Sequence, residues 1–314
     1  YFNVELDCDG IPAVKSKIFD PDEAEQLRSR CQGSEAIVTA VKEAEKKVKA
    51  PKLYDLTTLQ REANRIYGMT AKQTLDTAQS LYEKKLITYP RTDSQYLTED
   101  MEQTARNVVR QIYEKYQLTG PFDQPEQPDV KKVMNNSKVT DHHAIIPTME
   151  LTSCHMDELK SWEEKILFLI AVHTVMAMSK DHIYQETEIE VECQGEVFKT
   201  KGKTVLQDGW KIFENCFKNK DRMAIADPDQ EMKERIPKVT KGQTFYAVAA
   251  EKTEHFTSPP KPYSEDTLLA AMETAGNKEF DEDTEKKGLG TPATRAGIIE
   301  KLIYSQYATR KGKQ

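Results

Sequence analysis

The hydrophobic pattern of the chain changes twice, and this change restricts the folds that it can adopt. In the first 50 residues apolar and polar side chains alternate, as in the run from Phe2 to Asp7, which predicts half-buried strands. Apolar side chains then recur at helical spacing as far as residue 182, and the alternation returns from Tyr184. We therefore expect a multidomain α+β protein in which two halves of one β-rich domain flank an inserted helical domain.

Four sections follow from this pattern. Residues 1–52 and 183–257 are expected to form the two halves of the β-rich domain, and residues 53–182 the helical domain between them. Residues 258–314 are expected to form a separate C-terminal helical segment. Ser258 to Pro262 holds three prolines, which predicts a stiff linker in front of that last segment.

Start and stop signals place the helices of the middle section. Gly68 divides residues 57–83 into two helices, which Thr57 and Thr70 can cap. With the extended segment after them, these helices resemble a helix-turn-helix with a wing, which binds DNA but is more often plain packing. Further helices are expected at residues 97–116, 156–178 and 265–274, and strands at residues 2–6, 13–19 and 37–48, the last of which could also be a helix.

A tyrosine and an arginine lie close together just after the second of these helices. Pro90 disfavours the α region for the residue before it, so Tyr89 should be extended rather than helical. Arg91 can hold a phosphate in a planar, bidentate fork. Tyr89 is therefore a candidate nucleophile for phosphate chemistry, although most tyrosines are structural.

The overall charge points away from nucleic acids. The 314 residues carry a net charge of −7 and the pI is about 5.6, whereas nucleic-acid-binding domains are usually basic. A globular interaction protein is one interpretation of this composition. Binding to DNA would require a local basic groove, with acidic runs such as residues 279–283 facing water elsewhere.

Cysteine usage and hydropathy favour a cytoplasmic protein. The five cysteines include no C-x-x-C pair, which argues against a zinc site and against a disulfide framework. No apolar run reaches the roughly 18 residues that a membrane helix needs, and no signal peptide opens the sequence. We expect no membrane partner.

Four segments in order resemble the type IA DNA topoisomerases, and their topoisomerase III branch more closely than topoisomerase I. Leu53 to Glu83 resembles the paired helices before the family's nucleophile, and Leu86 to Ser94, with its Tyr-Pro-Arg, resembles the active-site segment. Asp141 to Thr148, which reads Asp-His-His-Ala-Ile-Ile-Pro-Thr, resembles the histidine motif. Gly288 to Ile299 resembles the helix that flanks the family's groove for single-stranded DNA.

The resemblance implies a reaction and a set of catalytic residues. Tyr89 would cleave one DNA strand through a 5′-phosphotyrosine, after which the enzyme passes a strand and reseals the break. The phenolate leaves readily, so the step reverses without ATP. Arg91 would stabilise the charge in the transition state, His142 would donate a hydrogen bond or a proton, and Asp93 would orient one of them. The implied outcome is relaxation of negative supercoils and decatenation of DNA.

The resemblance also implies contacts with DNA and a β-rich arch that carries the helical domain. Thr291 and Pro292 are expected to begin the last helix, whose N-terminal N–H groups can bind phosphate. The full set of expected DNA-binding residues is Gln79, Gln60, His143, Thr291, Thr294 and Arg295.

One part of the family pattern is missing. The metal-binding Toprim domain precedes these motifs in the family, and Asp7-Cys8-Asp9 lacks the glutamate of its acidic cluster. We therefore expect a central fragment without a metal site of its own, inactive alone, whose Mg²⁺ is bound elsewhere in the intact enzyme. Its expected partner is single-stranded DNA, its state monomeric, and its location the nucleoid. The alternatives are a fragment of topoisomerase I or reverse gyrase, or a non-catalytic winged-helix DNA-binding module.

Overall fold

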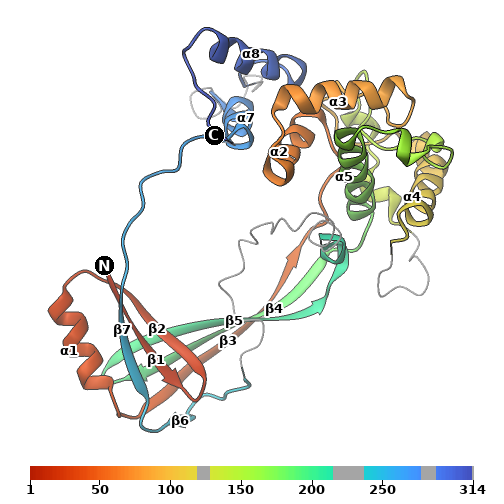
Figure 1. Cartoon of the computed structure of the whole chain (residues 1–314). Helices are drawn as coiled ribbons and strands as arrows, with labels where there is room; N and C mark the ends of the chain where they lie inside the picture. The colour runs from red at the N-terminus through yellow and green to blue at the C-terminus, as the bar shows by residue number, and fades with distance from the viewer. Residues whose placement is uncertain (119–127, 215–236, 277–287, 313–314) are drawn as a thin grey trace. The chain divides into compact units, whose positions relative to one another are not determined.

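The structure is a computed structural model that describes residues 1–118, 128–214, 237–276 and 288–312 (Figure 1). The chain forms two compact units, and each is described by itself. The strand unit comprises Tyr1–Val48, His182–Asp208 and Ala226–Pro260, and the helical unit comprises Lys49–Asp181, Gly209–Ile225 and Lys261–Gln314. The acidic run at residues 279–283 lies outside the described residues.

The strand unit is built on one antiparallel sheet with the strand order β6-β3-β4-β5-β2-β1-β7. Strands from early and late parts of the sequence are therefore interleaved in this one sheet. The strands are β1 (Phe2–Cys8), β2 (Ile11–Ile18), β3 (Ala36–Val48), β4 (His182–Cys193), β5 (Glu196–Gln207), β6 (Thr244–Phe245) and β7 (Ala249–Glu254).

Only part of this sheet has a hydrophobic core. Alternate residues of β1 and β2 are buried beneath α1 (Pro21–Cys31), which contacts β1 and β7. Further along, β3 is exposed over most of its length and pairs with β4 through to Val48. This pairing excludes the helical alternative for residues 37–48.

Charged side chains stabilise the exposed part of the sheet. Lys199 on β5 lies 2.9 Å from Glu190 on β4, and Lys201 lies 3.2 Å from Glu188. Opposite charges on neighbouring strands stabilise a sheet by a few tenths of a kcal/mol to about 1 kcal/mol per pair. β3, β4 and β5 thus form a ribbon held by main-chain ladders and ion pairs.

The helical unit is organised around α5, whose residues 166–172 are all buried. A helix that is apolar on every side must be surrounded by protein. α3 and α4 contact α5, and Figure 1 shows α2, α3 and α4 grouped with it. The described helices of this unit are α2 (Leu56–Tyr67), α3 (Ala71–Glu83), α4 (Glu102–Tyr116), α5 (Ser161–Ala177), α7 (Glu265–Thr274) and α8 (Pro292–Tyr304).

Several helix ends differ from the expected ones. Asp55, not Thr57, caps α2, because its carboxylate accepts the Thr58 N–H at 2.7 Å, while Thr57 lies buried in the first turn. Thr70 caps α3 as predicted, and Gly68 ends α2 with a φ of 69°. The two longer helices begin later than expected, since α4 starts at Glu102 and α5 at Ser161.

α7 and α8 pack on α2 and α3 through a small apolar cluster of their own. Its buried members are Ala71, Leu269, Met272, Ala296 and Ile299. Polar contacts surround the cluster: the Arg61 Nε donates to Asp266 Oδ1 at 2.8 Å, and a carboxylate oxygen of Glu265 accepts the Ala71 N–H at 2.6 Å.

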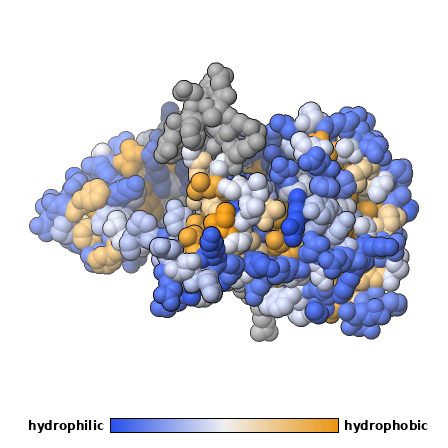
Figure 2. All heavy atoms as spheres, turned by 90° about the horizontal axis from the view of Figure 1, so that it is seen from above, coloured by the Kyte–Doolittle hydropathy of each residue, from blue (hydrophilic) through white to orange (hydrophobic). Residues whose placement is uncertain are grey.

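One face of the molecule is mostly polar. Figure 2 shows one face on which hydrophilic side chains predominate, with hydrophobic ones among them. Within the described ranges, no helix combines the length and the apolar character that crossing a membrane requires.

Candidate active site around Tyr89 and His142

The backbone reverses immediately after α3 and enters an extended segment. Lys85 has a positive φ of 61°, and Ile87 then pairs with Pro147 in an isolated antiparallel bridge. Tyr89 follows outside any helix, in accord with the restriction imposed by Pro90. Its side chain is half-buried.

A buried carboxylate anchors this reversal. Glu163, whose side chain is 3% exposed, accepts Ser80 Oγ at 2.7 Å and Lys84 Nζ at 2.7 Å, and also caps α5 through the Lys160 N–H. Burial alone would raise the pKa of Glu163, but these hydrogen bonds and the charge of Lys84 outweigh burial and lower it to about 2. The carboxylate therefore ties the end of α3 to the start of α5.

The extended segment pairs with the histidine motif. The Thr88 N–H donates to the Ile146 carbonyl at 3.0 Å, and the Thr148 N–H donates to the Leu86 carbonyl at 3.0 Å. Leu86 and Ile146 are buried in the main core of the helical unit. Two segments far apart in the sequence are thus held side by side.

This pairing brings three aromatic rings together. The Tyr89 and His142 ring centroids are 4.3 Å apart, with the planes tilted by 43°, whereas Tyr82 meets Tyr89 edge-on at 5.4 Å. His142 is exposed. Sequence reasoning missed Tyr82, whose one signal is its place in the last turn of α3, just before the extended segment.

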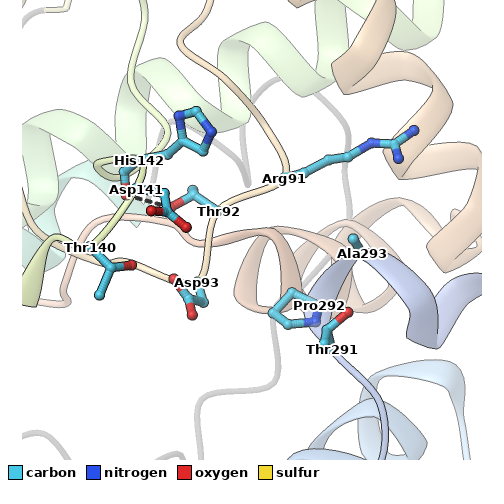
Figure 3. A pocket seen from close by; sticks show the side chains of 9 residues that line it. All are labelled: Arg91, Thr92, Asp93, Thr140, Asp141, His142, Thr291, Pro292 and Ala293. Atoms are coloured by element: carbon cyan, nitrogen blue, oxygen red, sulfur yellow. Dashed lines mark hydrogen bonds between the residues drawn. The ribbon is translucent and has the colours of Figure 1, made fainter.

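A pocket of about 180 Å³ opens next to these rings. Residues 91–93, 140–142 and 291–293 line it, the last group belonging to the start of α8 (Figure 3). In Figure 3 the Arg91 side chain extends away from the His142 ring. Arg91 is exposed and makes no hydrogen bond or ion pair with the described residues, so its guanidinium is available to an anion.

Carboxylates border the same pocket. Asp93 is exposed, and within the described parts of the chain no hydrogen bond joins it to Arg91 or His142. Asp55, which caps α2, is buried and does not line the pocket. Burial raises the pKa of Asp55 to about 6 against the lowering effect of its bonds from Thr58, and the charges of Glu273 and Asp93 raise it further.

The start of α8 contributes main-chain donors. Thr291 is the N-cap and Pro292 the first helical residue, as predicted. The Thr291 N–H donates to Thr294 Oγ1 at 2.9 Å, and the two hydroxyls lie 3.1 Å apart. The Ala293 N–H, at the pocket wall, is bonded to no described residue, which is typical of a helix N-terminus that can receive an anion.

Two of the expected DNA-binding residues are instead structural. Arg295 is 3% exposed and donates to Thr57 Oγ1 at 2.9 Å, to the Leu289 carbonyl at 3.1 Å and to the Gly290 carbonyl at 3.2 Å. Gln60 is fully buried, and its amide donates to the Ala71 carbonyl at 3.0 Å. Neither side chain can reach a strand of DNA in this arrangement, and both support helix ends.

Of the four other expected residues, Thr291 and Thr294 lie at the start of α8, and Gln79 and His143 are half-buried. Gln79 donates to Glu83 at 3.2 Å on a half-exposed face of α3. The His143 Nδ1 lies 2.9 Å from the Ala144 carbonyl, so this ring bonds within its own loop. His142, rather than His143, therefore faces Tyr89.

The described residues do not form a metal site. Among them, no group of three or more His, Cys, Asp and Glu side chains is arranged to hold an ion. Asp7, near the end of β1, accepts the Gly10 N–H at 2.6 Å, and Asp9 lies in the β1–β2 turn.

Comparisons with known proteins agree on one family. A family model described as DNA topoisomerase matches residues 1–314. The DNA topoisomerase 3 of Bacillus licheniformis is 36% identical over 338 residues, and that of Bacillus subtilis is 36% identical over 332 residues. Full-length topoisomerase I from Thermotoga maritima superimposes on the whole chain with a TM-score of 0.72 and 25% identity.

The chain spans less than half of each of these relatives. It covers 44% of both Bacillus proteins and 48% of the Thermotoga chain. Each of these alignments includes 100% of the present chain.

Proposed function

The chain belongs to the type IA DNA topoisomerase family, and on this premise we propose that it carries the nucleophile with which such an enzyme cleaves one DNA strand. The observation that supports the proposal best is the packing of the Tyr89 ring against the His142 ring, next to the pocket that Arg91 lines. A nucleophile, a proton donor and a cation are the groups that phosphoryl transfer to a tyrosine needs.

The proposed step begins with a phosphodiester in the pocket. The Tyr89 hydroxyl oxygen bonds to phosphorus, the bond from phosphorus to O3′ breaks, and the tyrosine is left on the 5′ phosphate. The phenolic proton is lost to solvent, and His142 donates a proton to O3′ as it leaves. Arg91 stabilises the negative charge that develops on the non-bridging oxygens.

The same groups serve resealing. The 3′ hydroxyl attacks the phosphotyrosine, the phenolate leaves, and His142 takes the proton back. Because the phosphotyrosine bond keeps the energy of the broken phosphodiester, neither direction needs ATP.

We place the DNA strand along the pocket and the start of α8. The hydroxyls of Thr291 and Thr294 and the free Ala293 N–H are suited to a phosphate, with Gln79 and His143 as further contacts. Gln60 and Arg295 are left out of this set because both are buried.

The remaining functions belong to the intact enzyme. We propose that the strand unit is the arch, that residues 53–182 are the nucleophile domain and that residues 258–314 belong to the groove for single-stranded DNA. The intact enzyme would act as a monomer on DNA at the nucleoid, passing a strand to relax negative supercoils and decatenate. Type IA enzymes use Mg²⁺, which we assign to a Toprim domain outside this chain. A topoisomerase I or reverse gyrase is the alternative within the family.

Trapping of the covalent intermediate tests the proposal. The longer protein that contains this chain is incubated with Mg²⁺ and an end-labelled single-stranded oligonucleotide, and then denatured. Wild type and Tyr82→Phe should retain label on the protein, and Tyr89→Phe should not. An adduct that survives Tyr89→Phe would show that another residue is the nucleophile, and the absence of any adduct in wild type would leave only a non-catalytic DNA-binding module.

A further inference from the structure

Two threonines flank Tyr89, and both use their hydroxyls on the histidine motif. Thr88 Oγ1 donates to the Ala144 carbonyl at 3.0 Å, and Thr92 Oγ1 donates to the His142 carbonyl at 2.9 Å. The two acceptors enclose His143. The main chain of the histidine motif is therefore hydrogen-bonded at His142 and at Ala144 to the segment that carries the candidate nucleophile.

Thr92 is buried, and both its hydroxyl and its carbonyl are hydrogen-bonded. Thr92 is 2% exposed, its Oγ1 also accepts the Ser94 N–H at 3.1 Å, and its carbonyl accepts the Leu56 N–H at 3.1 Å. One residue thus links the histidine motif, the turn after Tyr89 and the start of α2. Replacing its hydroxyl with a methyl group would leave the His142 carbonyl and the Ser94 N–H without this partner.

Thr88 supplies the second anchor. Its Oγ1 accepts the Ile146 N–H at 3.0 Å while donating to Ala144, and its own N–H donates to the Ile146 carbonyl. The Thr88 side chain thereby adds a second hydrogen bond to Ile146, beside the one that the main chain makes.

The imidazole of His142 has no comparable support of its own. It makes no hydrogen bond with any described residue, and its described ring contact is the one with Tyr89. A side chain without a polar partner takes its position from its main chain, and the His142 carbonyl is bonded to Thr92. The Thr92 bond therefore holds the main chain from which the ring reaches Tyr89.

We propose that Thr92 is a positioning residue that sets His142 against Tyr89, with Thr88 as the second anchor. This inference rests on the proposed function for its effect on catalysis, but its geometric part stands without it. A misplacement of about 1 Å in an active site can cost on the order of 100-fold in rate. Thr92→Val should therefore slow both cleavage and resealing by about 10- to 100-fold, with little change in the Kd for DNA.

A spectroscopic test on this chain does not need strand cleavage. In wild type, the His142 ring protons should carry a ring-current shift from Tyr89 in NMR spectra, identified as the shift that Tyr89→Leu abolishes. Thr92→Val should reduce this shift, and Thr92→Ser, which keeps the hydroxyl, should preserve it. Thr77→Val is the control, since Thr77 is half-buried on α3 and its hydroxyl donates to the Gln73 carbonyl of the same helix.

A kinetic test uses the longer protein and a labelled single strand. Single-turnover cleavage should fall in Thr92→Val, recover in Thr92→Ser and remain unchanged in Thr77→Val. If Thr92→Val does not fold, Thr88→Val takes its place with the same expectation. An unchanged His142 shift in the valine variants, or a serine variant as slow as the valine variant, would overturn the proposal. A shift that responds as expected in a protein that never cleaves DNA would overturn the proposed function and leave the positioning role standing.

Discussion

The imidazole ring of His142 lies against the phenol ring of Tyr89, with the centroids 4.3 Å apart and the planes tilted by 43°. Residues 53 positions apart in the sequence meet here because their segments pair through Thr88 and Ile146. His142 is exposed and lines the pocket, so the proposed proton donor is in contact with both the proposed nucleophile and that pocket.

Arg91 and Arg295 should respond differently to substitution. Arg91→Ala should leave the free energy of unfolding within about 0.5 kcal/mol of wild type, because the side chain is exposed and unpaired among the described residues. It should weaken single-strand binding and reduce the slope of log K against log salt by about 1. Binding titrations at several salt concentrations measure this slope, and a slope that stays at the wild-type value would contradict a phosphate contact.

Arg295→Ala should instead destabilise the protein. It removes three hydrogen bonds and leaves the buried Thr57 hydroxyl and the Leu289 and Gly290 carbonyls without their donor. Urea unfolding should show a decrease on the order of 3 kcal/mol in the free energy of unfolding. Arg295→Lys is the matched control: it keeps the charge but not the planar fork, so it should recover only part of the loss.

Tyr82→Leu should slow cleavage without abolishing it. Edge-to-face aromatic pairs are worth about 0.5–1.5 kcal/mol, so loss of the contact with Tyr89 predicts a decrease of roughly 2- to 10-fold in single-turnover rate. Tyr82→Phe keeps the ring and should retain the wild-type rate. Equal rates in the leucine and phenylalanine variants would mean that the Tyr82 ring does not position Tyr89.

Glu163→Gln should destabilise the helical unit at neutral pH by about 1–3 kcal/mol, since hydrogen bonds to a buried charge are lost or weakened. The folded-state pKa of Glu163 is lowered to about 2, so its contribution is complete above the unfolded value near 4.3 and is lost as the pH falls towards 2. The difference between variant and wild type should therefore shrink from pH 6 to pH 2.5. Urea unfolding at several pH values measures this difference in stability. A difference that does not change with pH would contradict the link between Glu163 ionisation and stability.

Asp55→Asn should have the opposite pH dependence. The folded-state pKa of Asp55 is raised to about 6, above the unfolded value near 3.9, so the folded state holds the extra proton and wild-type stability falls as the pH rises from 4 to 6. Asparagine caps helices about as well as aspartate and does not titrate. Relative to wild type, the free energy of unfolding of the variant should therefore increase by on the order of 1–3 kcal/mol between pH 4 and pH 7, as measured by thermal unfolding.

Local signals predicted much of the fold. The Thr70 cap, the Gly68 break and the Pro292 helix start depend on neighbours a few residues away, and the structure has all three. Residues 37–48 could not be assigned to strand or helix from their own composition, because the deciding partner is β4, far along the chain.

The site was harder to predict where tertiary contacts determine which residues are buried and which residue caps a helix. Asp55 and Thr57 are both good caps two residues apart, and burial of Thr57 beneath Arg295 selects Asp55. The burial of Gln60 and Arg295 depends on contacts between α2, α3 and α8, which no local pattern reveals. The closeness of Tyr89 and His142 came only from the family resemblance, since an aromatic pair across two loops leaves no periodic signal.

The interleaved strand order has a consequence during synthesis on the ribosome. β1, β2 and β3 are made before the other strands of this sheet, but β3 can pair with its long partner β4 only after the whole stretch from Lys49 to Asp181 has been made. The main core of the helical unit draws most of its residues from that stretch, so this core can fold first and carry the ends of β3 and β4 together. Until then the edge of β3 is unpaired in the nascent chain, and an unpaired strand edge can pair with another chain and aggregate.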